Sequence, residues 1–180
     1  MRLIRSLDHW ARTYVLYVVT IIALVTGAAM MFLVPGIVGL SGGLPILDMR
    51  LFYSYDEMTQ LFGALGPEGL SLYGQLQLLD SVFPAAYGLA FCLMTLRLAN
   101  GIEYLVRYRV LALLSLLAAF FDYLENIAIA MMIHSYPAVA EANVLLSASF
   151  TAIKWILLST GVILLLMFLL IALVQRARRA

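Results

Sequence analysis

The sequence contains few charged residues and only one cysteine. Charged residues make up 12% of the 180 positions, whereas a typical soluble domain has about 25%. This low share excludes an ordinary soluble globular protein. Because Cys92 stands alone, the chain can form neither an internal disulfide nor a C-x-x-C redox pair. The formal net charge of +1 provides no general attraction to nucleic acid.

The motifs of several enzyme classes are also missing. There is no G-x-S-x-G nucleophile motif, no H-E-x-x-H metal motif and no glycine-rich phosphate loop. His9 and His134 fall at opposite ends of the helical bundle predicted below, so they cannot ligate a haem together. We therefore expect no cofactor and no metal centre. The chain also lacks internal repeats and long linkers, so residues 1–180 are predicted to form one domain.

Long hydrophobic runs dominate what is present. Hydrophobic residues make up 64% of the chain, and about 20 apolar residues suffice to cross a bilayer as a helix. Four segments are long enough: 13–34, 78–99, 110–133 and 144–174. We predict an all-α, polytopic membrane protein with a four-transmembrane-helix bundle. We expect Pro35-Gly36 to end the first helix and Pro84 to kink the second, since lipid-embedded prolines are tolerated where neighbouring helices satisfy the freed carbonyl.

The arginines predict how the four helices are oriented. Nine of them flank the predicted spans on one side of the membrane: Arg2, Arg5, Arg12, Arg97, Arg107, Arg109, Arg176, Arg178 and Arg179. By the positive-inside rule this side is the cytoplasm, so both termini are expected to be cytoplasmic. The predicted location is a cell membrane, such as the inner membrane of a bacterium. A cleaved signal peptide is the alternative for the first span, but the apolar stretch there is too long for one.

Residues 35–77 form the one sizeable outer segment. Ser54 and Glu57 have the S-x-x-E spacing of a helix capping box. Apolar residues follow at helical spacing: Met58, Leu61, Phe62 and Leu65. This pattern predicts a short amphipathic helix that lies on the outer membrane face, and Gly66-Pro67 is expected to end it and start the next helix. Two roles are open for this segment: a lid that closes the bundle, or an element that gates access of a substrate.

The third span carries three polar residues among its apolar ones. The apolar side chains of this span favour insertion by roughly 5 kcal/mol in total, while each central acid costs about 2.5–3.5 kcal/mol. The helix must therefore turn its polar groups away from lipid. At 100° per residue, Asp122, Glu125 and Asn126 share one face with small residues. Large apolar residues occupy the opposite face, which we expect to contact lipid: Leu113, Leu117, Phe120, Leu124, Ile127 and Met131.

The other spans also carry polar or small residues on one face. These are Tyr73, Gln77, Asp80, Pro84, Tyr87 and Phe91 in the second span, Asn143, Ser147, Thr151, Lys154 and Gly161 in the fourth, and Thr13, Tyr17, Thr20 and Gly27 in the first. Four such faces predict one shared polar interior. We expect an outward-opening ligand or ion pocket formed by Asp80, Tyr87, Asp122, Glu125, Asn126 and Lys154. Arg50 and Gln77 are candidates for an outer gate, and a pairing of Arg50 with Asp80 is open.

Acidic groups outnumber basic ones in this predicted pocket. Asp80, Asp122 and Glu125 face Lys154, with Arg50 as a second cation only if it reaches inward. Because burial disfavours ionised carboxyl groups, we expect at least one of them to hold a proton at neutral pH, or a cation to bind there.

Three functional classes remain open, and the sequence leaves undecided whether the protein is an enzyme. The leading interpretation is binding or translocation of a proton, a small cation or an amine-bearing small molecule. The second is a small membrane-embedded enzyme that acts on a lipid or an isoprenoid- or sterol-like substrate by acid/base chemistry. The third is a structural or accessory membrane subunit whose polar groups fix helix register. Expected partners are the bilayer, a lipid or small cationic ligand, and a second copy or another membrane subunit; nucleic acid is not expected.

Overall fold

The computed structural model describes residues 2–178, and all regular secondary structure in this range is helical. The elements, in chain order, are α1 (Arg2–Ala11), α2 (Val15–Leu40), the 3-10 helix η1 (Leu47–Met49), α3 (Tyr55–Leu79), α4 (Phe83–Asn100), the 3-10 helix η2 (Glu103–Ala112), α5 (Leu113–Ser135) and α6 (Glu141–Ala177). Four helical segments are long and apolar enough to cross a membrane: Val15–Leu40, Tyr55–Asn100, Glu103–Ser135 and Glu141–Ala177. The predicted all-α fold with four spans is confirmed.

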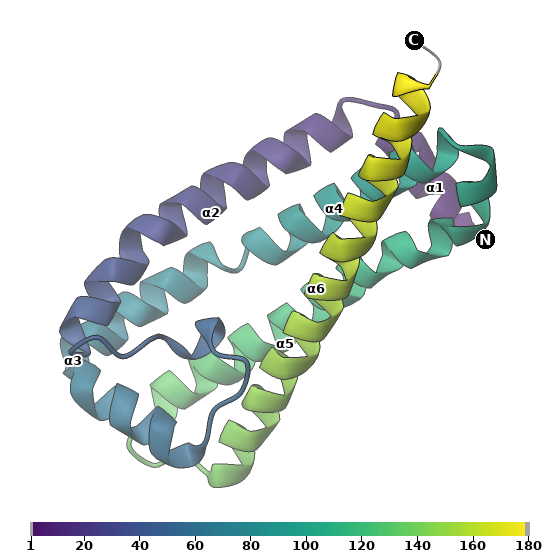
Figure 1. The fold of residues 1–180 in the computed structure, drawn as a ribbon. Coiled ribbons are helices and arrows are strands. Elements are labelled where there is room, and N and C mark those ends of the chain that lie inside the picture. Colours follow the sequence, from purple (N-terminus) through teal and green to yellow (C-terminus); the bar gives the residue numbers. More distant parts are fainter. Residues whose placement is uncertain (1, 179–180) are drawn as a thin grey trace.

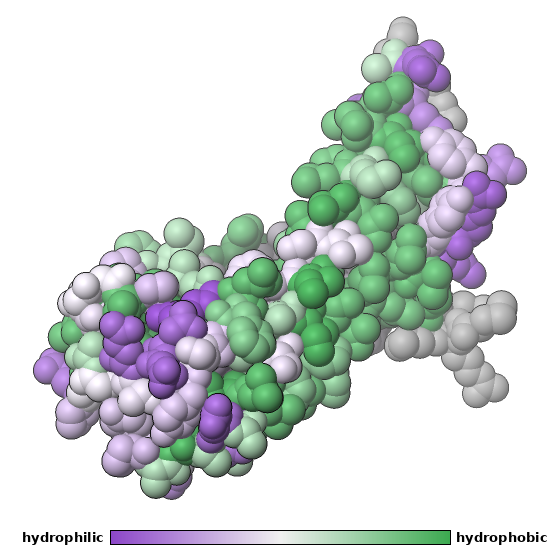
Figure 2. Space-filling view, turned by 60° about the horizontal axis from the view of Figure 1, so that its bottom comes forward, coloured by the Kyte–Doolittle hydropathy of each residue, from purple (hydrophilic) through white to green (hydrophobic). Residues whose placement is uncertain are grey.

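The helices run between two polar ends of an elongated molecule. Figure 1 shows α1, η2 and the last turns of α6 at one end, which we call the inner end. The loop 41–54, the first half of α3 and the turn between α5 and α6 lie at the opposite, outer end. Hydrophilic residues gather at both ends, and hydrophobic surface lies between them (Figure 2). This distribution is the one that a bilayer-spanning protein requires.

Three side-chain contacts hold α1 against the rest of the inner end. Asp8 accepts a hydrogen bond from Asn100 Nδ2 at 2.8 Å and pairs with Arg109 Nη1 at 3.5 Å. Arg97 Nη1 donates to the carbonyl of Ala11. Of the nine flanking arginines, Arg179 lies outside the described residues.

The first long helix continues past the proline at which we predicted its end. Pro35 lies inside α2, which runs to Leu40. A proline removes one backbone hydrogen bond, and an apolar helix tolerates this loss. The chain reverses only at Gly42 and Gly43, whose φ angles of 72° and 97° favour glycine, and the N–H of Gly43 bonds to the carbonyl of Val38.

Pro84 starts a helix instead of kinking one. We predicted a continuous second span with a kink, but α3 ends at Leu79 and α4 begins at Phe83. The residues between them form a turn in which the N–H groups of Ser81 and Val82 bond to carbonyls three residues earlier. Proline is well suited to the first turn of a helix, where its missing N–H has no partner to lose. The second crossing is therefore made of two helices joined by a turn that includes Asp80.

The third and fourth crossings differ little from the predicted ranges. The structure assigns residues 110–112 to η2, so α5 begins at Leu113 and not at residue 110. The last crossing, α6, extends a few residues beyond the predicted range at each end.

The predicted capping box is present at the start of α3. Ser54 Oγ accepts from the N–H of Glu57 at 3.2 Å, and Glu57 Oε2 accepts from the N–H of Ser54 at 2.8 Å. A break also occurs where we expected one, because Gly66 has φ 59° and ψ −172°, outside the helical region. The apolar face between these points differs from our expectation: Met58, Leu61, Phe62 and Leu65 are buried within the protein core and do not lie on the membrane face.

Removal of the cap should weaken this end of the molecule. We expect Ser54→Ala to lower the free energy of unfolding by about 1 kcal/mol, because the N–H of Glu57 loses its partner. Denaturation of the purified protein in detergent, followed by circular dichroism, measures the effect. Thr59→Ala is the matched control, since Thr59 is exposed on the same helix. Equal stability of the two variants would contradict a role for the cap.

Candidate functional site

The polar face of α5 is turned into the protein, as its periodicity predicts. The residues buried along this helix are Ser115, Ala118, Ala119, Asp122, Glu125, Asn126, Ile129 and Met132. On the opposite face Leu117, Phe120, Ile127 and Met131 are exposed. Small residues permit α4 and α6 to approach α5 closely, and the polar residues then meet side chains from those helices.

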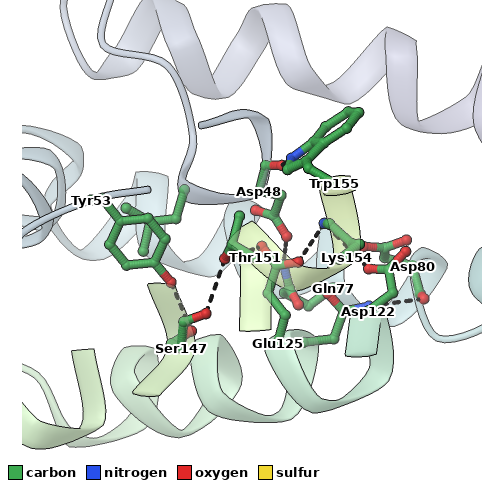
Figure 3. Close-up of polar contacts among 12 residues, drawn as sticks. Asp48, Tyr53, Gln77, Asp80, Asp122, Glu125, Ser147, Thr151, Lys154 and Trp155 are labelled. Carbon is green, nitrogen blue, oxygen red and sulfur yellow. Dashed lines mark hydrogen bonds and ion pairs between the residues drawn. The ribbon is translucent and has the colours of Figure 1, made fainter. Parts of the chain in front are cut away.

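An ion-paired lysine lies at the centre of the buried polar groups. Lys154 Nζ, from α6, pairs with Asp122 Oδ1 at 3.4 Å and also with Glu125 Oε2. The remaining oxygens of these acids accept from hydroxyl groups. Tyr87 donates to Asp122 Oδ2 at 2.9 Å. Thr151 donates to Glu125 Oε1 at 2.8 Å, and Figure 3 shows these two residues with Lys154. Three helices, α4, α5 and α6, therefore contribute to one hydrogen-bonded network.

The outer loop adds a carboxyl group that the sequence did not lead us to expect. Asp48, in η1, accepts hydrogen bonds from the hydroxyl of Tyr73 and from Gln77 Nε2, the latter at 3.0 Å. Its backbone carbonyl accepts from the indole N–H of Trp155 at 3.2 Å. Figure 3 shows Asp48 beside Lys154 and Thr151. In the sequence, Asp48 is a single acidic residue within an apolar stretch. No periodicity indicates that it packs against the helices.

We use the name acid cluster for Asp48, Asp80, Asp122, Glu125 and Lys154. Lys154 is ion-paired with Asp122 and Glu125. Asp48 is half-buried, and the other four side chains are buried. The acid cluster therefore holds four carboxyl groups and one amine, and the half-buried Asp48 lies on its outer side.

The two predicted gate residues have different partners. Arg50 pairs with Glu57 at 3.3 Å and donates twice to the carbonyl of Pro45. It does not pair with Asp80, because these contacts hold its guanidinium against the loop and the start of α3. Gln77 lies deeper and donates to Asp48. The structure thus leaves the acid cluster with Lys154 as its one described cation.

The polar residues of the first span do not join this interior. Tyr17 is exposed, and Thr20 donates to the carbonyl of Leu16 in its own helix at 2.7 Å. Helix α2 packs beside α3 and α4 (Figure 1) and buries only Leu16 and Ile37 among its residues. In the fourth span Asn143 is exposed as well. The shared interior is therefore built from three crossings and the outer loop.

A tyrosine of the outer loop closes the cluster on the side of α6. The hydroxyl of Tyr53 donates to Ser147 Oγ at 2.7 Å, and burial raises the pKa of this tyrosine, so it stays a neutral hydrogen-bond donor. Thr151 also bonds to the carbonyl of Ser147. These contacts fix the loop against α6 next to Glu125.

Four buried side-chain oxygens in this region accept no hydrogen bond from any described residue, and one of them, Glu125 Oε2, is ion-paired with Lys154. The other three are Gln77 Oε1, Asp80 Oδ1 and Asn126 Oδ1. The side chains are 8%, 4% and 7% exposed, respectively. Asn126 Nδ2 donates to the backbone carbonyl of Asp80 at 3.2 Å, which places the end of α3 against α5. Unpaired buried acceptors are costly, so these three oxygens stand out as the groups of this region whose capacity for hydrogen bonds is unused.

The protein is tightly packed on the inner side of the acid cluster. A Cβ atom at Gly88 would lie 2.7 Å from Ala119 Cβ and 3.1 Å from the carbonyl oxygen of Ser115. Among the described residues, the buried polar side chains on this side are Ser115 and Thr95, and each donates to a carbonyl three or four residues earlier. In this conformation the polar network reaches the outer end but stops before the inner one.

Within residues 2–178, no three or more His, Cys, Asp or Glu side chains are grouped so that they could hold a metal ion. Comparison of the chain with protein-family models, with curated proteins and with solved structures finds no match.

Proposed function

We propose that this membrane protein binds a small cation, or a small molecule that carries an ammonium group, at its acid cluster. One observation carries the proposal: Lys154 pairs with two buried carboxyl groups, Asp122 and Glu125, and two further carboxyl groups, Asp48 and Asp80, lie in the same mostly buried region without a cation of their own. Moving an uncompensated charge out of water costs several kcal/mol. A bound cation would supply the missing positive charge, and protons would do so when no cation is present.

Asp80 is the carboxyl group best placed to receive this cation. Lys154 already pairs with Asp122 and Glu125, and Asp48 accepts hydrogen bonds from Tyr73 and Gln77. Asp80, in contrast, is buried and has an oxygen without a hydrogen-bond partner. A cation beside Asp80 would give this carboxyl group a positively charged partner, as Lys154 already does for Asp122 and Glu125.

The inner end of the molecule supports cytoplasmic termini. Arg97, Arg107 and Arg109 lie in or near the connection between α4 and α5, and Arg12 and Arg176 lie at the same end in α1–α2 and α6. By the positive-inside rule this end faces the cytoplasm. The acid cluster would then be reached from the opposite side of the membrane. Tight packing around Gly88 favours binding from that side over an open path through the protein.

Replacement of Asp80 tests the proposal. We expect Asp80→Asn to weaken the binding of sodium or methylammonium at least tenfold, equivalent to about 1.4 kcal/mol, because the charged acceptor is lost. Isothermal titration calorimetry of the purified protein, in detergent with choline chloride as background salt, measures both dissociation constants.

The matched control is Asp56→Asn, which removes an exposed carboxyl group of α3 outside the cluster and should leave binding unchanged. The proposal is wrong if neither cation binds to the unaltered protein, or if Asp80→Asn binds both of them as tightly.

A second candidate function, catalysis on a lipid, is favoured by a groove on the flank of α6. Its volume is about 500 Å³, and the loop and α6 line it with Met49, Leu51, Trp155, Ile156, Ser159 and Thr160. Because Trp155 also bonds to Asp48, an apolar chain in this groove would lie next to the acid cluster. Chemical conversion of an added isoprenoid or sterol-like lipid by the purified protein would favour catalysis over binding.

A further inference from the structure

A second groove lies between the end of α3 and α5, beside the acid cluster. Its volume is about 370 Å³, which falls in the range of small-molecule sites. Its polar lining residues are Gln77, Ser81, Tyr123, Asn126 and His134, and Leu78, Ile127, Ala130 and Ile133 form its apolar walls. Leu78 and Ile127 are among the exposed large hydrophobic residues. The groove therefore opens sideways, toward the lipid-facing surface.

Two of the residues with unpaired acceptors, Gln77 and Asn126, line the groove, and the third, Asp80, is held next to Asn126. Gln77 directs its amide N–H toward Asp48, which leaves Oε1 without a partner. Asn126 directs its amide N–H toward the carbonyl of Asp80, which leaves Oδ1 without a partner. Asp80 follows Gln77 by three residues, so the two side chains lie on the same face at the end of α3. Each of the three side chains is more than nine-tenths buried, and each has an unpaired oxygen.

These features match one class of ligand. A primary ammonium group has three N–H donors and no acceptor. The groove wall offers the unpaired amide oxygens of Gln77 and Asn126, and the unpaired carboxyl oxygen of Asp80 lies next to Asn126. A quaternary ammonium group has the same charge but no N–H donor. The apolar walls beside the polar one require an apolar body on the same molecule.

We propose that the groove between α3 and α5 binds an amphipathic primary amine, with its ammonium group at Gln77, Asp80 and Asn126 and its apolar chain along Ile127 and Ala130. The ligand reaches the groove sideways from the bilayer. This inference rests on the proposed function, because it names the cation that the acid cluster receives.

The test compares three probes on the protein in lipid nanodiscs, with empty nanodiscs subtracted. Octylamine should bind at least tenfold more tightly than octyltrimethylammonium, because only the primary amine donates hydrogen bonds to the three oxygens. Methylammonium should bind without help from the apolar walls. Equal affinities for octylamine and octyltrimethylammonium would overturn the proposed head-group contacts.

Filling the groove provides the second arm of the test. Ala130 is exposed and lines the groove, so Ala130→Trp should weaken octylamine binding at least tenfold and leave methylammonium binding unchanged. Ala130→Leu is a milder variant with the same expected direction. Leu146→Trp is the control, since it adds a ring at an exposed position of α6 outside the groove.

The two proposals fail in different ways. If octylamine binds to Ala130→Trp and to Ala130→Leu as tightly as to the unaltered protein, the groove is not its site, although methylammonium binding would still support the acid cluster. If no probe binds to the unaltered protein, both proposals are wrong.

Discussion

Lys154→Met is expected to lower the free energy of unfolding by about 3–5 kcal/mol. The substitution retains an unbranched side chain of similar length but removes the charge that pairs with Asp122 and Glu125. Both acids are buried, and a buried acid without its partner is strongly destabilising. Unfolding in increasing concentrations of SDS, followed by circular dichroism, gives the change.

Two further variants determine whether the effect comes from the buried charges. Combining Lys154→Met with Asp122→Asn and Glu125→Gln should recover most of the lost stability, because no charge then remains unpaired at this point. Arg50→Met removes a pair with the exposed Glu57 together with two hydrogen bonds to the carbonyl of Pro45, but leaves no buried acid without its partner, and should cost less than Lys154→Met. A cost of Lys154→Met no larger than that of Arg50→Met would show that water or counter-ions already compensate the acids.

Gly88→Leu should have the second largest effect, a loss of about 3 kcal/mol. Even a Cβ atom at this position would overlap Ala119 Cβ and the carbonyl of Ser115, and a larger side chain would force α4 away from α5. Gly39→Leu is the control, since a Cβ atom there has no atom within 4 Å. Thermal unfolding in detergent compares the two variants.

A compensating pair makes this prediction more specific. Gly88→Ala should also destabilise the protein, and Ala119→Gly in the same chain should recover part of the loss by removing the closer of the two overlapping atoms. The remaining contact is with a backbone carbonyl, so recovery should be incomplete. If Gly88→Leu is as stable as Gly39→Leu, the two helices are not in close contact here.

The polar face of α5 could be predicted because acidic and amide side chains of a membrane-spanning helix rarely face lipid. Asp122, Glu125 and Asn126 recur at helical spacing, and each is costly in hydrocarbon, so periodicity alone indicates that they face protein. The same reasoning placed Lys154 among candidate partners of Asp122 and Glu125, and the structure brings these three together. The capping box formed by Ser54 and Glu57 could also be predicted, because it depends on residues only three positions apart.

Other parts of the site depend on contacts between segments that are distant in sequence. Asp48 lies in a loop with no periodicity, and only the packing of η1 against α3 and α6 brings it to Tyr73 and Trp155. Arg50, two residues later, bonds to Pro45 and Glu57 instead of turning inward. Nothing local distinguishes these two outcomes for neighbouring charged residues.

The prolines and the amphipathic segment illustrate the same limit. Pro35 lies within a helix and Pro84 begins one, because the surrounding packing decides which backbone groups are satisfied. The face formed by Met58, Leu61 and Phe62 has the pattern of a membrane-surface helix, yet protein covers it. An apolar stripe indicates that something apolar covers it and does not distinguish lipid from protein.

The turn that divides the second crossing also affects the electric field at Asp80. Aligned peptide dipoles give the C-terminal end of a helix about half a negative charge, and α3 ends immediately before Asp80. A carboxylate at this position is repelled by the helix end, whereas a bound ammonium ion would be attracted by both. If α3 and α4 joined into one continuous helix, the helix end with its partial negative charge would no longer lie at Asp80, and this attraction would fall. Cation binding and straightening of the second crossing are therefore thermodynamically opposed, so that each would disfavour the other.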